Sequence, residues 1–191
     1  IIFGGYNRYD FESLCILSIN SIYYDSNNLM HLLYNSEDFN GQFAWLDKTI
    51  LECLNEEKYI WFLNHEPPTT GTFYGNMMYK IMNKYRDKII HQFYGHRHSD
   101  QFLLFMDKSV IGSGFLPPSF MPDNHDPGLR VYHYNGSHVN DYDQYVVRLQ
   151  KTIAKNDIVL EKSYSFRDMY SIEPSQKGLE YIRNKMSQNS T

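Results

Sequence analysis

The sequence predicts an α/β domain, and two observations indicate it. Short apolar runs of strand length alternate with two segments whose apolar residues recur at helical spacing, and a series of further short strands separated by turn residues follows. The predicted order is βαβαβ followed by a meander. A chain of 191 residues with 42% hydrophobic composition can bury a sizeable core, which argues against disorder and repeat arrays.

Each element of the first part has its own pattern. The run 14–19 is apolar and of strand length, and the aromatic-rich run 59–63 ends before two prolines that cannot continue a strand. Apolar residues between 43 and 54 follow helical spacing, with Asp38 and Asn40 as candidate N-caps. A second helix has one apolar face, which we interpret as core packing and which consists of Tyr74, Met77, Met78, Ile81, Met82 and Tyr85.

The later part of the chain is predicted to be mostly strands. Apolar runs at 89–94, 101–106, 110–115, 129–134 and 144–149 are separated by Asp-Lys, Pro-Pro and Asn-Gly turn signals. Beyond Leu149 the composition changes to Lys, Asn, Ser and Glu, with weak helical patterns at 164–170 and 179–186. We therefore expect one domain over residues 1–150 and a short helical C-terminal extension over 151–191.

Composition and charge exclude several classes of function. A formal charge of -4 gives no reason to expect nucleic acid as a partner, and no apolar run approaches the ~20 residues of a membrane span. Two cysteines, Cys15 and Cys53, allow at most one disulfide and have no zinc-finger spacing. The sequence begins with Ile1 and without a signal-peptide pattern, so we expect a processed or truncated piece.

Three histidines follow two of the predicted strands. His65 comes just after the run 59–63, and His96 and His98 come just after the run 89–94. The C-terminal ends of strands in such a sheet meet at one edge, and alternate residues of an extended chain project to one side, so we expect three imidazoles at one metal site. The remaining histidines lack this context and are predicted to be structural or solvated: His31, His91, His125, His133 and His138.

Several motifs together resemble a known family. They are NHEPP at 64–68, QFYGHRHSDQF at 92–102, LPPS at 116–119 and DPGLRVY at 126–132. In order and spacing they resemble the C-terminal part of acid sphingomyelinases and acid sphingomyelinase-like phosphodiesterases, within the calcineurin-like metallophosphoesterases. The likeness extends from about Leu14 to Leu149.

The resemblance implies a fold and part of a site. It implies the C-terminal half of a metallophosphoesterase domain, with two packed mixed β-sheets flanked by helices. By family role, His65 and His96 ligate one ion of a dinuclear Zn2+ centre, and His98 ligates the other. Arg97, which lies between two of these histidines, is a candidate cation for the phosphate, although a residue next to a ligand in an extended segment projects to the opposite side. The remaining ligands and the general-acid histidine belong to the family's N-terminal half, and their motifs are missing from this sequence. This segment alone is therefore expected to be inactive.

The resemblance also implies a reaction. The complete enzyme would hydrolyse a small-molecule or lipid phosphodiester by attack of a metal-bound hydroxide, with sphingomyelin giving ceramide and phosphocholine, or a related phospholipid or nucleotide as substrate. Its partner would be the N-terminal half of the same protein, with at most peripheral membrane contact, and its location secreted or lysosomal. Sequons at Asn135 and Asn189 agree with that location. The alternative is an incomplete or degenerate homologue that acts as a binding module without catalysis.

Overall fold

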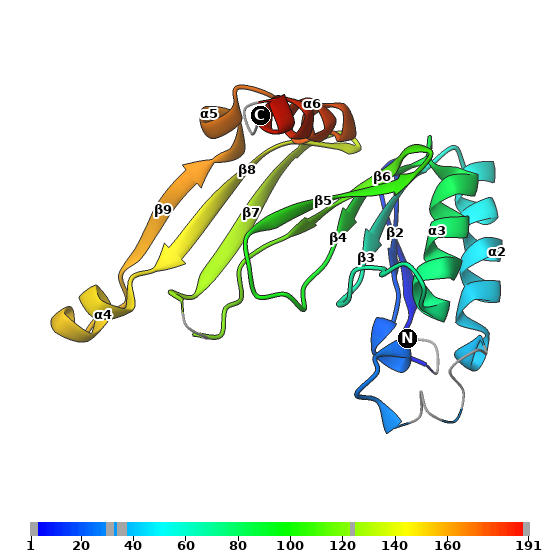
Figure 1. Cartoon of the computed structure of the whole chain (residues 1–191), viewed down its shortest axis with the longest axis horizontal. Coiled ribbons are helices and arrows are strands. Elements are labelled where there is room, and N and C mark those ends of the chain that lie inside the picture. Colours follow the sequence, from blue (N-terminus) through cyan, green and yellow to red (C-terminus); the bar gives the residue numbers. More distant parts are fainter. Residues whose placement is uncertain (1–3, 30–32, 34–37, 123–124, 189–191) are drawn as a thin grey trace. The chain divides into compact units, whose positions relative to one another are not determined.

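The computed structural model describes residues 4–29, 33, 38–122 and 125–188. Its contacts divide the chain into two compact units, the first made of Ile1–His96 and Leu104–Gly114 and the second of Arg97–Leu103 and Phe115–Thr191 (Figure 1). The C-terminal extension predicted over residues 151–191 belongs to the second unit, and its boundary at residue 150 stays a prediction.

A six-stranded sheet has the order β1-β2-β3-β4-β6-β5. Strands β2, β3 and β4 are parallel neighbours, and β1 pairs antiparallel with β2 at the edge. The bounds are β1 Asn7–Phe11, β2 Leu14–Ser18, β3 Tyr59–Leu63, β4 Ile89–Phe93, β5 Gln101–Asp107 and β6 Ser109–Leu116. Because helices α2 (Gln42–Asn55) and α3 (Phe73–Tyr85) connect the parallel strands, the predicted βαβαβ order is confirmed.

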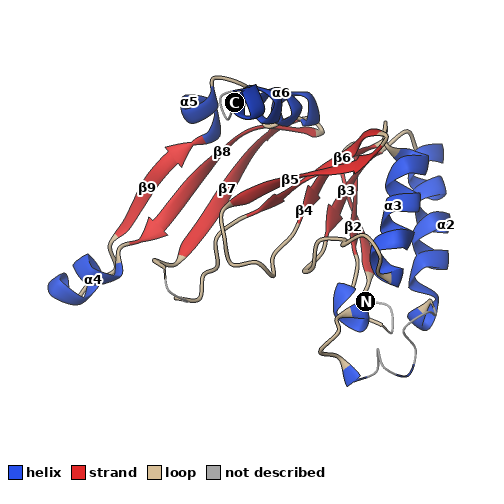
Figure 2. Cartoon of the chain, viewed as in Figure 1, coloured by secondary structure: helices blue, strands red, loops and turns tan. Residues whose placement is uncertain are grey.

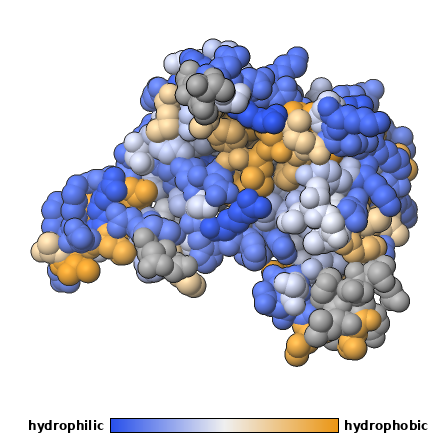
Figure 3. All heavy atoms as spheres, in the orientation of Figure 1, coloured by the Kyte–Doolittle hydropathy of each residue, from blue (hydrophilic) through white to orange (hydrophobic). Residues whose placement is uncertain are grey.

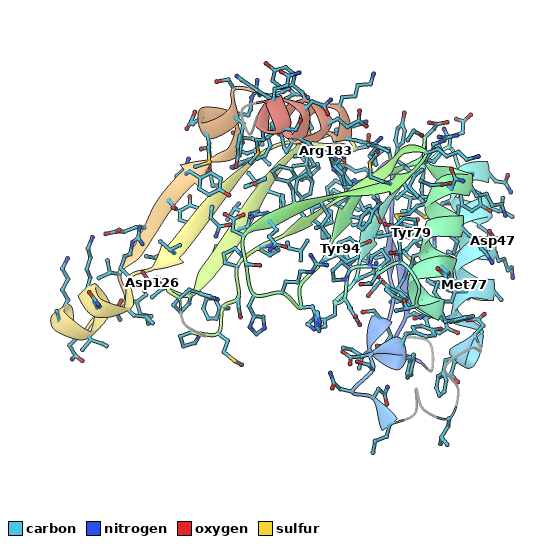
Figure 4. The ribbon with its side chains drawn as sticks, in the orientation of Figure 1. Asp47, Met77, Tyr79, Tyr94, Asp126 and Arg183 are labelled. Atoms are coloured by element: carbon cyan, nitrogen blue, oxygen red, sulfur yellow. A yellow bond between two sulfur atoms is a disulfide. The ribbon has the colours of Figure 1, made fainter. Side chains whose placement is uncertain are left out.

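Helices α2 and α3 run side by side along one face of the parallel strands (Figure 2). Fully buried side chains fill the layer between them: Leu17, Phe62, Leu46, Ile50, Met78 and Met82. Asp47 on α2 accepts hydrogen bonds from Lys84 and Tyr85 of α3, on the outer side of the pair. The methionine and tyrosine stripe is therefore core, as predicted, except that Met77 is only half-buried (Figure 4).

A disulfide joins Cys15 of β2 to Cys53 of α2, with a Cα–Cα distance of 6.1 Å. Both residues are fully buried. The sequence allows at most one disulfide without predicting that it forms. In the structure it joins the first parallel strand to the helix that follows.

Helix α2 is capped from a distance in sequence. The Asp38 carboxylate accepts hydrogen bonds from the backbone N–H groups of Phe43 and Ala44, at 2.7 and 2.9 Å. Gly41 is the N-cap residue itself, so Asp38 caps the helix from three residues before the N-cap position and not as its N-cap. Asn40 makes no cap, because it lies in a left-handed turn with φ of 54° one residue before Gly41.

The second unit is built on an antiparallel sheet of order β7-β8-β9. The strands are β7 Gly128–Asn135, β8 His138–Val147 and β9 Leu160–Ser165, and the helices are α4 Leu149–Lys155, α5 Phe166–Tyr170 and α6 Gln176–Gln188. Its core is aromatic: Phe115, Tyr142 and Phe166 are almost completely buried, and the Tyr142 ring centroid lies 5.1 Å from that of Phe166.

Three expectations about elements are corrected. Strand β1 was not predicted, because NRYDF is a mostly exposed edge strand with few apolar residues. Strand β8 starts at His138 instead of Gln144, and Leu149 begins helix α4 instead of ending a strand. The segment 151–191 contains strand β9 besides its predicted helices, because β9 pairs with β8 and extends the sheet.

Hydrophobic side chains also reach the surface. Figure 3 shows hydrophobic atoms at the tip that α4 forms, where Ile153 and Ile158 are 78% and 74% exposed. Within the described part of the chain, every helix is too short or too polar to cross a membrane.

Candidate functional site

The C-terminal ends of three parallel strands form the edge that carries the predicted site. Their registers align Ser18 with Leu63 and Leu63 with Phe93, so the strands β2, β3 and β4 end together. The residues that follow each strand, Asn20, His65 and His96, therefore lie along one edge of the sheet, as the sequence predicts for His65 and His96.

Backbone hydrogen bonds extend this pairing beyond the strands. The Asn64 N–H donates to the Phe93 carbonyl at 3.0 Å, and the Gly95 N–H donates to the His65 carbonyl at 2.8 Å. On the other side, the Glu66 N–H donates to the Ser21 hydroxyl at 2.8 Å. The backbone on either side of His65 is thus fixed although its side chain is exposed.

Gly95 allows the two histidine loops to approach. A Cβ atom at this position would lie 3.3 Å from His65 Nδ1, closer than most Cβ contacts. The glycine of the Gly-His-Arg-His motif therefore leaves room for the His65 ring against the backbone of the next loop.

His65 and His96 form a pair. Their ring centroids lie 5.3 Å apart and their planes cross at 85°. With Zn–N bonds of about 2.0 Å and a tetrahedral angle, two imidazole ligands of one ion place their centroids about 5 Å apart. The centroid spacing of the pair is close to this value, and its role as two ligands of one zinc ion stays a prediction.

His98 and Arg97 belong to the second unit. The expectation that the Gly-His-Arg-His segment is extended is wrong, because His96 and His98 have left-handed backbone with φ of 70° and 50°. Arg97 is exposed, and its contact with a phosphate stays a prediction. Among the described residues, no group of three or more His, Cys, Asp or Glu side chains is arranged to hold a metal ion.

A buried polar pair behind the edge was not predicted. The Tyr94 hydroxyl donates to Gln92 Oε1 at 2.7 Å, and burial raises the pKa of this tyrosine far above its usual value (Figure 4). Gly112 and Gly114 of β6 make room for these side chains, since Cβ atoms there would lie 2.6 Å from Gln92 Nε2 and 2.7 Å from the Tyr94 ring. In the sequence, the alternating glycines of VIGSGF at 110–115 were the pattern that could have indicated large side chains packed against this strand.

The other histidines have structural surroundings. His91 is buried edge-on against Trp61, and His125 Nδ1 lies 2.9 Å from the Asp126 carbonyl oxygen. His133 Nε2 lies 3.0 Å from Asp143, and His138 Nδ1 lies 2.9 Å from the Ser137 hydroxyl. His31 lies outside the described residues.

The two sequons differ in what the structure describes. Asn135 ends strand β7 and is exposed beside the turn at Gly136, where a glycan would meet no obstacle from a buried core. Asn189 lies outside the described residues.

Comparison with known proteins identifies homologues. The cyclic GMP-AMP phosphodiesterase SMPDL3A of Homo sapiens is 28% identical over 185 residues, which cover 86% of this chain and 40% of that protein. Sphingomyelin phosphodiesterase A of Dictyostelium discoideum is 26% identical over 98% of this chain and 34% of its own length. The resemblance to acid sphingomyelinase-like phosphodiesterases is confirmed.

Human sphingomyelin phosphodiesterase is also similar, at 29% identity over 76% of this chain and 25% of its own length. No protein-family model matches the chain. The homologues are thus phosphodiesterase hydrolases, and the chain spans well under half the length of the relatives it matches.

Proposed function

We propose that this chain is the C-terminal half of a metal-dependent phosphodiesterase that hydrolyses sphingomyelin or a related phospholipid or nucleotide phosphodiester. The observation that carries the proposal is the His65–His96 pair, which lies at the ends of neighbouring parallel strands with the spacing of two zinc ligands. The names of the homologues, which are phosphodiesterases of sphingomyelin and of cyclic GMP-AMP, support the reaction class.

In this proposal the histidines hold a dinuclear Zn2+ centre, with His65 and His96 on one ion and His98 on the other. Zinc bound there supplies Lewis-acid stabilisation of the charge that develops on the phosphoryl oxygens. The chain's own part is to hold the imidazoles at the sheet edge. The hydrogen bonds from the Gly95 N–H to the His65 carbonyl and from the Glu66 N–H to the Ser21 hydroxyl fix the backbone there. Arg97 is the candidate cation for the phosphate.

A partly exposed sheet face, on which Tyr9 and Leu63 are exposed and His91 is buried, supports a partner that completes the domain. Tyr9, Trp61 and Leu63 lie on the face of the parallel strands opposite the helices, since they align with Ile16, His91 and Phe93 across the registers. Tyr9 is 63% exposed and Leu63 is 41% exposed. Because parallel sheets are normally buried on both faces, we propose that the N-terminal half of the same protein covers this one and supplies the remaining ligands and the general acid.

Two features support a secreted or lysosomal location. A buried disulfide between Cys15 and Cys53 is typical of proteins that fold in an oxidising compartment. The exposed sequon at Asn135 agrees with passage through the secretory pathway.

The test is hydrolysis of bis-p-nitrophenyl phosphate by the complete protein, before and after chelation, with zinc content measured on the same sample. We expect near two zinc ions per molecule, turnover that the chelator abolishes, and loss of turnover in His96→Ala and His98→Ala. His133→Ala is the matched control, because this histidine contacts Asp143 and should leave turnover unchanged. Retained turnover in the first two variants would contradict the site.

Absence of both zinc and turnover in the complete protein would instead indicate a homologue that keeps the fold and acts by binding. If the zinc centre is present, a comparison of sphingomyelin with nucleotide phosphodiesters would identify the substrate. The ester whose turnover shows the highest kcat/KM decides between the two classes.

A further inference from the structure

A buried arginine in the second unit contacts the segment that carries His98. The Arg130 side chain is 0% exposed, and its guanidinium carbon lies 4.0 Å from the centroid of the Tyr142 ring. Its Nε donates to Gln144 Oε1 at 3.0 Å, and the Gln144 amide in turn donates to the backbone carbonyls of Leu129 and Tyr145. The guanidinium is therefore fixed by strands β7 and β8.

The fixed guanidinium pairs with Asp100, which lies between β4 and β5, two residues after His98. Arg130 Nη2 donates to one carboxylate oxygen of Asp100, and the Tyr164 hydroxyl donates to the other. Arg130 is on β7 and Tyr164 is on β9, so two strands of one sheet hold a single carboxylate. Charge-assisted hydrogen bonds of this kind are stronger than neutral ones and more specific in geometry.

The segment 97–99, which precedes Asp100, has an unfavourable backbone conformation at His98. His98 has a left-handed φ of 50°, which disfavours a residue with a Cβ atom, and such conformations persist where surrounding structure fixes them. Inside the turn, the Ser99 hydroxyl donates to the Arg97 carbonyl at 3.1 Å. The contacts of Asp100 with the sheet add an anchor directly after this turn.

We propose that Arg130 and Tyr164 are positioning residues, which act through Asp100 to hold His98 in the orientation of a metal ligand. The metal part rests on the proposed function, because it is Zn2+ that His98 would bind. The anchor itself is a property of the second unit and is measured separately. Groups that hydrogen-bond a metal ligand orient it, and their loss typically lowers metal affinity by about 10- to 100-fold. Because Asp100 acts on His98 through the backbone, we expect an effect at the lower end of this range.

The experiment uses three variants of the complete protein. Asp100→Asn removes the charge of the carboxylate, and Tyr164→Phe removes only the hydroxyl. Arg130→Lys keeps the positive charge but removes the planar guanidinium and its fixed set of N–H donors. For each, Zn2+ affinity is measured by competition with a chelator, and amide hydrogen exchange is measured over residues 97–99. We expect Zn2+ affinity to fall by about 10-fold in Asp100→Asn and less in Arg130→Lys and Tyr164→Phe, with faster exchange in all three.

Asp143→Asn is the matched control. Asp143 is also a carboxylate of this sheet that pairs with a cation, Lys162, and with a hydroxyl, Ser165. It should lower thermal stability to a similar degree while leaving Zn2+ affinity and exchange at residues 97–99 unchanged. Excess Zn2+ should restore hydrolysis in Tyr164→Phe, as expected for a residue that acts through the metal ligand.

The outcomes separate the two hypotheses. Unchanged Zn2+ affinity and unchanged exchange in folded Asp100→Asn and Tyr164→Phe would overturn the positioning role, whatever the wild-type protein hydrolyses. A wild-type protein without bound Zn2+ or turnover would overturn the proposed function and the metal part of this inference. Faster exchange in the variants would then still establish the anchor on the second unit.

Discussion

Asp143 is a residue whose charge state makes stability depend on pH. The Lys162 ammonium, and after it the Ser165 hydroxyl and His133, lower the pKa of this carboxyl to about 2. In the unfolded chain the pKa of an aspartate is about 3.9, so its contribution is complete above about pH 4 and is lost as the pH falls through 2. The interaction therefore favours the folded state at neutral pH.

We predict that Asp143→Asn lowers the free energy of unfolding by about 1 kcal/mol at pH 7 and has a much smaller effect near pH 2, where the carboxyl is largely protonated in both states. Urea denaturation of both proteins at the two pH values measures this difference. Equal loss at both pH values would show that the charge of Asp143 is not what stabilises the fold.

At this scale the sequence predicts positions better than conformations. His65 and His96 are correctly placed because strand ends meet wherever the strands are parallel, which needs no knowledge of side chains. The left-handed turns at His96 and His98 were missed, because glycine is the residue that marks positive φ reliably and histidine adopts it in only a small fraction of cases. The role of Arg130 depends on Asp100, 30 residues earlier in the chain, and no local pattern indicates such a pair.

Among the elements, β2 and α2 are joined covalently. The Cys15–Cys53 bridge closes a loop with a sequence separation of 38. In the chain-entropy model, a bridge over such a loop stabilises the folded state by about 3 to 4 kcal/mol, because it restricts the unfolded chain. Since both cysteines are fully buried, the bridge is also protected from reductant while the protein is folded.

We predict that urea unfolding under reducing conditions shows a loss of about 3 kcal/mol relative to oxidising conditions. The double variant Cys15→Ala/Cys53→Ala should be equally destabilised and insensitive to reductant, which makes it the control. Identical midpoints for the wild-type protein with and without reductant would contradict a stabilising bridge.

The elements also show where sequence patterns suffice. Helix α3 and strand β3 have the predicted bounds within one residue, because a stripe of apolar residues at helical spacing and an aromatic run before two prolines are strong local signals. Strands β1 and β9 were missed, because exposed edge strands have few apolar residues and exist through pairing with β2 and β8. Pairing with a distant segment leaves no mark in the local sequence.

At the scale of the whole molecule, the two faces of the parallel sheet differ in exposure. The helices cover one face of the parallel strands, where Leu17 and Phe62 are 0% exposed, whereas Leu63 on the opposite face is 41% exposed. This difference motivates the proposal that the N-terminal half of the protein packs there.

A lysine placed on the exposed sheet face, compared with one placed on the exposed side of helix α2, tests that proposal. We predict that Leu63→Lys has little effect on the thermal midpoint of the 191-residue chain but lowers that of the complete protein strongly, because burying an unpaired ammonium is costly. Leu51→Lys is the control, because Leu51 is 46% exposed on α2. This substitution should change the free energy of unfolding of either protein by no more than about 0.5 kcal/mol, and so leave both midpoints nearly unchanged. If Leu63→Lys has the same small effect in both proteins, the N-terminal half does not cover this face and the missing zinc ligands must come from elsewhere.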